Sequence, residues 1–342
     1  MWLVVAHHLV VNSGVMELSN PAAIDSGHAL FLHLFGAWGK MAINCFVLIS
    51  GYFMCTSNLT GRRYLKLFLE YAFYSWTVWI ALVFMNYETF TLSGVKDRLF
   101  AMFVNVNTEF MASFLWFYLG IPIYNIVIGA LDKRGLYLLI AGLVVMFTAS
   151  SSMFRNDAAF NHVFWYMTMY FIGSSIRLYP FNWMNRRSVP IILLTTLLLF
   201  EFALAFAGYL SHQLDLPLPP LRPILLSQSD RVFALLISVS MFLVFRNIDI
   251  PCNRAINTIA STCFGVLLIH GASDGMRNLL WVDVLSIQKS YHWGLPSFIA
   301  YSVFSVSAVF SVCSVIDMLR IKIAEKPLFA RFFGGTYGVK IT

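Results

Sequence analysis

The sequence predicts an all-α membrane protein, a polytopic bundle of about ten membrane-spanning helices. Of the 342 residues, 59% are hydrophobic and only 11% are charged, whereas soluble domains carry about 25% charged residues. The hydrophobic residues also gather into long runs, as helices do that cross a hydrocarbon layer. One soluble core could not bury so much apolar surface, so lipid must solvate much of it.

The apolar runs place the expected helices, with loose boundaries because some runs are shorter than a full span of about 20 residues. We expect spans at about 1–14, 38–56, 66–86, 111–131, 136–152, 161–177, 189–209, 231–246, 255–271 and 297–319. The mixed stretch 93–107 is expected to lie in the membrane interface. The longest outer loops, 15–37, 209–230 and 272–296, are each too short to form a domain. We therefore expect one integral membrane domain over residues 1–331 and a short cytoplasmic tail over 332–342.

Basic residues are divided unequally between the two sets of alternate loops. Fifteen of the 23 Lys and Arg residues fall on one side of the predicted membrane, and eight fall on the other. Cytoplasmic loops carry the excess of positive charge, so the first side is cytoplasmic and ten spans place both termini there. The eight outer basic residues are Lys40, Lys96, Arg98, Arg155, Arg222, Arg231, Arg277 and Lys289. This pattern predicts a multi-pass protein of the plasma (inner) membrane.

Charge and cysteine usage disfavour several classes of function. The formal net charge is +7, but the basic residues form short clusters between apolar runs, which indicates topology rather than nucleic-acid binding. The five cysteines are scattered and show no CxxC or Cys/His ligand spacing, so we expect no disulfide and no metal site. The first residues lack a basic region and a cleavage site, so we do not expect a removable signal peptide.

Ionisable residues inside apolar runs are functional candidates because burying them in a membrane is costly. His7 and His8 lie in the middle of the first run, where adjacent helical positions point about 100° apart and only one can face a given site. Histidine can act as a general base near neutral pH. The alternative is a pair of polar side chains that hydrogen-bond to neighbouring helices. His270 ends a late apolar run, and an interfacial histidine explains it equally well.

Charged residues near the second and third apolar runs have two interpretations each. Arg62 and Arg63 suit the binding of phosphates, although they also contribute to the cytoplasmic excess of positive charge. Glu70 lies one helical turn after Lys66 and is expected to pair with it. Glu201 sits in the middle of a span, so it is either protonated, paired across helices, or functional.

Three uncharged residues complete the candidates. Ser50 and Gly51 allow close approach of a neighbouring helix, which is their default explanation, and Trp116 near an outer end suits an aromatic belt. We group the three with Glu70, Glu201 and His270 as candidates for a pore or acceptor site.

Taken in order, these segments resemble the acyltransferase 3 family of integral membrane acyltransferases, which includes polysaccharide O-acetyltransferases. The likeness covers essentially the whole chain. The family's first helix carries an Arg, ten residues and a His, and His8 matches the His. Phe46-Val-Leu-Ile-Ser-Gly-Tyr52 is similar to an apolar-Phe-Phe-x-x-Ser-Gly-Tyr motif, and Arg62-Arg63 match a basic pair that follows it. Further similar segments are Leu115-Trp116-Phe117, Leu267-Leu-Ile-His270 and Glu325-Lys326-Pro327.

The family's arginine would precede Met1, since it lies eleven residues before the histidine. We therefore expect an in-frame extension upstream of Met1 that encodes this Arg. The alternative is that the chain lacks it, which would put catalytic competence in question.

The resemblance implies transfer of an acetyl or similar acyl group from cytoplasmic acyl-CoA to a hydroxyl of an envelope or exopolysaccharide glycan, or of its lipid-linked precursor. His8, with His7 as its neighbour, would deprotonate the hydroxyl or carry the acyl group as an acyl-imidazole. Arg62 and Arg63 would bind the CoA phosphates. The implied partners are the bilayer, acyl-CoA as donor substrate and the glycan acceptor, with no permanently bound cofactor, no metal and no nucleic acid.

Two other classes share the predicted topology. A transporter or exporter of a glycan or lipid-linked intermediate would use the intramembrane His and Glu residues for proton coupling. A polysaccharide polymerase is disfavoured because such enzymes tend to have a large outer loop, which this sequence lacks.

Overall fold

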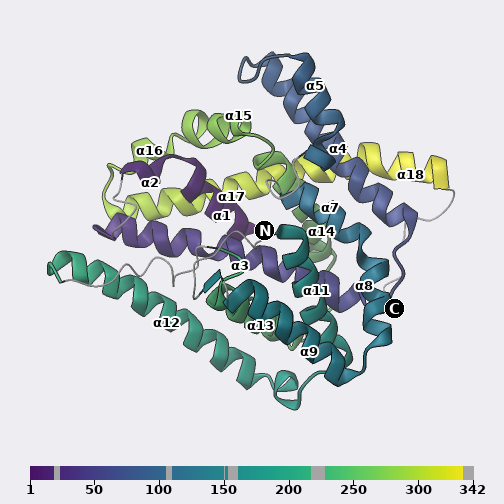
Figure 1. The fold of residues 1–342 in the computed structure, drawn as a ribbon. Helices are drawn as coiled ribbons and strands as arrows, with labels where there is room; N and C mark the ends of the chain where they lie inside the picture. The colour runs from purple at the N-terminus through teal and green to yellow at the C-terminus, as the bar shows by residue number, and fades with distance from the viewer. Residues whose placement is uncertain (19–23, 105–109, 150, 153–160, 217–227, 334–342) are drawn as a thin grey trace.

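The computed structural model describes residues 1–18, 24–104, 110–149, 151–152, 161–216 and 228–333. Every regular element within these ranges is helical (Figure 1). Each of the ten apolar runs is mainly helical where it is described, which confirms the all-α fold class. Most of the predicted tail, from residue 334, lies outside the described ranges, as does the middle of the loop 209–230.

The first half of the chain contains α1 (Trp2–Asn12), α2 (Val15–Leu18), α3 (Gly27–Met54), α4 (Gly61–Phe84), α5 (Leu92–Leu99), α6 (Ala101–Val104), α7 (Phe110–Leu119), α8 (Ile121–Ala130), α9 (Lys133–Val144) and the π-helical η1 (Val145–Ala149). The second half contains α11 (His162–Leu178), the 3₁₀ turn η3 (Asn182–Asn185), α12 (Ser188–Gln213), α13 (Val232–Arg246), α14 (Arg254–His270), α15 (Asp274–Arg277), the π-helical η4 (Asn278–Val284), α16 (Ile287–Ser290), α17 (Leu295–Arg320), the π-helical η5 (Ile321–Glu325) and α18 (Lys326–Phe333).

Four helical segments are long and apolar enough to cross a membrane by themselves: α3, α4, α12 and the continuous segment Leu295–Phe332. Two bent pairs raise the number of candidate spans to six. In the first, α7 and α8 meet at 50°, because Pro122 in the first turn of α8 cannot continue the hydrogen bonds of α7. In the second, α14 and Asp274–Val284 meet at 99°. The count of about ten spans and the cytoplasmic termini stay predictions.

Helix extends into two of the predicted outer loops, beyond the loose boundaries of the apolar runs. α3 begins at Gly27, where the side chain of Ser26 accepts a hydrogen bond from the amide of Ala29 at 3.1 Å. The histidines of this segment lower its mean hydropathy. The ring nitrogen Nε2 of His28 nevertheless has a hydrogen-bond partner within the protein, the carbonyl oxygen of Trp293 at 3.0 Å. α15, η4 and α16 likewise occupy much of the predicted loop 272–296. The expected interfacial segment 93–107 forms α5 and α6 in its described part.

α3 lies at the centre of the bundle and packs against α1, α11, α12, α13 and α17 (Figure 1). Its contact with α11 depends on two glycines. A Cβ atom on Gly51 would lie 2.8 Å from the Cα of Tyr170, and one on Gly173 would lie 3.0 Å from the amide nitrogen of Tyr52. The two backbones therefore touch, as small residues allow in membrane helices. Gly51 is a packing residue, and this confirms the default explanation of its motif.

Candidate functional site

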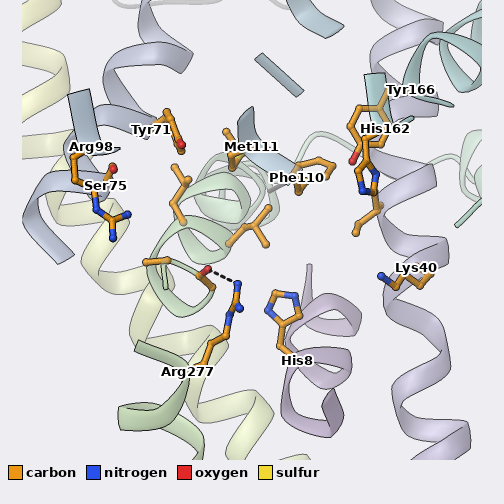
Figure 2. A pocket seen from close by; sticks show the side chains of 15 residues that line it. His8, Lys40, Tyr71, Ser75, Arg98, Phe110, Met111, His162, Tyr166 and Arg277 are labelled. Carbon is orange, nitrogen blue, oxygen red and sulfur yellow. Dashed lines mark hydrogen bonds between the residues drawn. The ribbon is translucent and has the colours of Figure 1, made fainter. Parts of the chain in front are cut away.

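A pocket of about 220 Å³ opens between α1, α3, α4, α7, α11 and α14 (Figure 2). Its polar lining is His8, Lys40, Tyr71, Ser75, Arg98, His162, Tyr166 and Arg277, and its apolar lining includes Phe110, Met111, Leu267 and Leu268. Three of the lining residues are basic, and none of the described lining residues carries a carboxylate. The pocket therefore combines histidine chemistry with a cationic wall.

His8 enters this pocket because its neighbours hold α1 against α3. Val10 packs on Gly36, where an added Cβ atom would lie 3.0 Å from the valine Cβ. His7 turns toward α3 and its Nδ1 donates a hydrogen bond to the carbonyl oxygen of Gly36 at 2.7 Å. His7 therefore anchors α1, while His8, about 100° around the helix, faces the pocket. The structure separates the two histidines as the helical geometry predicts.

The imidazole of His8 lies beside two groups that shape its surroundings. Its ring centroid is 4.8 Å from that of His270. A Cβ atom on Gly271 would lie 3.3 Å from His8 Cε1, so a glycine at this position leaves the ring edge uncovered. Nδ1 of His8 is buried and has no hydrogen-bond partner within the described ranges. This nitrogen is available to a bound substrate.

His270 is a neighbour of His8 and not an exposed interfacial histidine. Its side chain is fully buried, and its Nδ1 donates a hydrogen bond to the carbonyl oxygen of Val266 at 2.5 Å. This bond to the preceding helical turn fixes the orientation of the His270 ring at the end of α14, just before the bend. His270 therefore limits the positions that the His8 ring can take.

The cationic wall comes from three separate segments. Figure 2 shows Arg277 and Lys40 on either side of His8, with Arg98 farther along the pocket. Nη1 of Arg277 donates to Asp274 Oδ1 at 2.7 Å, and Nη2 of Arg98 lies 3.6 Å from Glu88 Oε2. The sequence pattern predicts only a topological role for these three residues. Lys40 could have been found, because it lies within a predicted span, as His8 does.

Arg62 and Arg63 lie at the other end of α4. Thr60 begins this helix, and its hydroxyl accepts a hydrogen bond from the amide of Arg63 at 3.4 Å. Both arginines are exposed, and Arg62 lies over the ring of Phe329 at 5.9 Å. Ser75, in the pocket, follows Arg62 by thirteen residues, or about 20 Å at the helical rise. The arginine pair and the pocket are thus two distinct polar regions.

The model of the acyltransferase 3 family, described as an acyltransferase domain, matches residues 1–318. The chain belongs to the acyltransferase 3 family. Comparison with curated proteins and with solved structures gives no match. The family assignment confirms the resemblance found in the sequence and identifies a membrane acyltransferase. The matched residues include every residue that lines the pocket.

Glu70 lies outside this acyltransferase pocket, in a buried ion network. Its carboxylate pairs with Nη2 of Arg320 at 2.9 Å, whereas Lys66 pairs with Glu325 at 2.9 Å. The expected pair between Glu70 and Lys66 was therefore wrong, because α17 and η5 bring a buried arginine and a second carboxylate to the same face of α4. Arg320 also donates through Nε to Asp317 at 2.6 Å and through Nη1 to Glu325 at 2.8 Å.

The other sequence candidates do not line the pocket. Ser50 donates a hydrogen bond to the carbonyl oxygen of Phe46 at 3.2 Å, within its own helix. Trp116 Nε1 donates to the carbonyl oxygen of Met102 at 2.9 Å and so joins α7 to α6. Glu201 is fully buried on α12. No cluster of three His, Cys, Asp or Glu side chains suited to a metal occurs in the described part of the chain.

Proposed function

We propose that this membrane acyltransferase moves an acetyl or similar acyl group from cytoplasmic acyl-CoA to a hydroxyl of an envelope or exopolysaccharide glycan, or of its lipid-linked precursor, in the plasma membrane. The observation that carries the proposal is the open Nδ1 of His8 at a pocket within the family domain. Ten spans with both termini inside place Arg62 and Arg63 on the cytoplasmic side, and Lys40, Arg98 and Arg277 toward the outer side.

His8 acts on the acceptor hydroxyl in this proposal. Its free imidazole nitrogen takes the hydroxyl proton while the oxygen attacks the thioester carbonyl, so that a C–O bond forms and the C–S bond breaks. The CoA thiolate leaves and receives the proton from the imidazolium. In the alternative sequence, His8 attacks the thioester first and expels the CoA thiolate, which forms an acyl-imidazole; the hydroxyl oxygen then displaces the imidazole, and its proton goes to the thiolate. Both sequences need an unpartnered nitrogen in the pocket.

The size of the pocket favours separate places for the two substrates. A volume of about 220 Å³ is below the usual range of roughly 300–1,000 Å³ for drug-sized ligands, so the pocket suits one sugar residue and not a nucleotide. The phosphates of acyl-CoA then need another cationic site. The exposed pair Arg62 and Arg63 supplies it, and the acyl end of the donor would reach His8 along α4.

A kinetic comparison tests this assignment. Purified protein in nanodiscs is expected to consume acetyl-CoA when an acceptor glycan is supplied. Arg62→Gln with Arg63→Gln should raise KM for acetyl-CoA roughly tenfold to a hundredfold for each lost phosphate contact, and KM for the glycan much less. Lys133→Gln removes a basic residue from another predicted cytoplasmic loop and serves as the matched control.

The outcome also separates the enzyme from the transporter alternative. Glycan flux across vesicles without consumption of acetyl-CoA would contradict the proposal and support a transporter. Unchanged kinetics in the Arg62 and Arg63 double variant would move the donor site elsewhere, since the pair would then act only as a topology signal.

A further inference from the structure

Besides the histidine nitrogens, three polar atoms of the pocket can donate hydrogen bonds. Nε of Arg98, Nε of Arg277 and the hydroxyl of Ser75 are each buried and lack a hydrogen-bond partner within the described ranges. All three are hydrogen-bond donors, and all three residues line the same pocket. A buried donor left unpaired lowers the stability of the folded protein. Three such donors around one pocket indicate a ligand that accepts hydrogen bonds.

The charge of the wall specifies that ligand further. The two guanidiniums and Lys40 face a pocket whose lining, among the described residues, contains no carboxylate. Lys40 has the buried Asp230 near enough for an electrostatic interaction. The acidic neighbours of the two arginines lie outside the pocket and pair weakly: Glu88 is 3.6 Å from Arg98, too long for a direct hydrogen bond, and the side chain of Asp274 is 91% exposed. An exposed pair of this kind contributes little, so the two guanidiniums keep positive charge for a ligand to neutralise.

We propose that the acyl acceptor carries an anionic group, a carboxylate or a phosphate, close to the hydroxyl that is acylated, and that Arg98 and Arg277 bind this group while Lys40 adds long-range attraction. This inference rests on the proposed function and names the substrate class of the same site. Guanidinium groups suit carboxylates and phosphates because their donors match two oxygens at once. An acidic sugar or a sugar phosphate meets the requirement, and a neutral sugar does not.

The donor also carries phosphates, so the same chemistry has a second possible source. Three features favour the acceptor. The pocket is too small for a nucleotide, its cations belong to the predicted outer set of basic residues, and Arg62 lies about 20 Å away along α4 with a cationic pair of its own. In Figure 2 the guanidinium of Arg277 lies next to the imidazole of His8, so an anion held there places a nearby hydroxyl within reach of the base.

Thermal unfolding of the purified full chain in a phosphate-free, non-ionic detergent tests the proposal. The probes are glucuronic acid, glucose 6-phosphate and glucose, at equal ionic strength adjusted with sodium chloride. The two anionic probes should raise the unfolding midpoint, and glucose should not, because ligands that bind the folded state stabilise it. Arg98→Gln with Arg277→Gln should weaken the apparent affinity for glucuronic acid at least tenfold.

Control variants keep this test independent of folding and of the donor. Arg98→Lys with Arg277→Lys preserves charge and should retain part of the stabilisation, and Arg187→Gln, at an exposed ion pair with Asp249, should retain all of it. CoA should still stabilise the Arg98 and Arg277 double variant but not the Arg62 and Arg63 double variant. Equal stabilisation by glucose and by the anionic probes would overturn the proposal. It would also be overturned if CoA stabilised the Arg62 and Arg63 double variant but not the Arg98 and Arg277 double variant.

Failure of the proposed function gives a different result. The proposed acyl transfer is contradicted if CoA does not raise the unfolding midpoint of the wild-type protein and the wild-type protein does not consume acetyl-CoA. The preference for glucuronic acid over glucose is measured without a donor, so it decides the anion site separately.

Discussion

The buried ion network around Arg320 and the pocket with Arg98 and Arg277 lie on adjoining faces of α4. The two regions differ in whether the hydrogen-bond donors of their arginines have partners. In the ion network, Nε, Nη1 and Nη2 of Arg320 each pair with a carboxylate, from Asp317, Glu325 and Glu70. In the pocket, Arg98 and Arg277 keep their Nε atoms unpartnered among the described residues. The first region uses its charges to join helices, and the second has donors to offer a ligand.

Burial strengthens this contrast. The side chain of Arg320 is 6% exposed, so removing this arginine would leave three carboxylates in the interior without their shared cation. The side chain of Arg277 is 33% exposed, so water can replace its partner at modest cost. A charged residue near a membrane site is therefore better judged by its pairing than by its presence. Glu70 and His8 are both ionisable residues of predicted spans, and only His8 reaches the pocket.

Arg320→Gln should give the largest loss of stability. It leaves the carboxylates of Glu70, Asp317 and Glu325 without their shared cation, and breaking a buried pair costs about 3–5 kcal/mol. Chemical unfolding in detergent should show this loss, whereas Arg277→Gln should change stability by less than about 1 kcal/mol. Normal stability with abolished acyl transfer in Arg320→Gln would place Arg320 in the reaction site and break the contrast.

Tyr74→Phe should have an intermediate effect on the same network. The hydroxyl of Tyr74 donates to Asp317 Oδ1 at 2.7 Å, and a hydrogen bond to a charged group contributes about 1.5–3 kcal/mol. The unfolding free energy should fall by this amount. Acyl transfer by the folded fraction should be unchanged, since Tyr74 does not line the pocket. A loss of turnover larger than the loss of folded protein would contradict a purely structural role.

Lys66→Gln should have the smallest effect. Its side chain is 46% exposed, whereas its partner Glu325, at 2.9 Å, is only 3% exposed. Water can replace the exposed lysine, so we expect a loss near the range of about 0–1 kcal/mol known for exposed ion pairs. Glu325 keeps its bond to Arg320 in this variant. The measurement is the same unfolding curve at low and high salt. A destabilisation as large as that of Arg320→Gln would show that Lys66 belongs to the buried part of the network.

The helical class and the different directions of His7 and His8 could be predicted from the sequence, because both depend on local pattern. Apolar runs predict helices, and the angle between adjacent positions predicts that His7 and His8 diverge. Local sequence pattern was insufficient to predict which charged residues pair. Arg320 reaches Glu70 only after the chain has folded, so the local spacing from Lys66 to Glu70 gave the wrong partner. Arg98 and Arg277 join the pocket through the same kind of long-range packing.

The start of α3 could not be predicted from hydropathy for a related reason. Hydropathy counts His28 as polar, yet the folded chain supplies the carbonyl of Trp293 as its partner. Such a partner becomes visible only when α3 and the segment before α17 lie together.

The most direct measurement is acyl transfer from acetyl-CoA by His8→Ala and His7→Ala, with the unfolding midpoint of each variant measured in parallel. A positioned general base contributes about 10²–10⁴-fold in rate, so His8→Ala should lose activity by this factor and keep a normal midpoint. His7→Ala should lose the bond to Gly36, cost about 1 kcal/mol of stability and retain most activity. An active His8→Ala protein beside an inactive, folded His7→Ala protein would contradict the assignment of the reaction to this pocket.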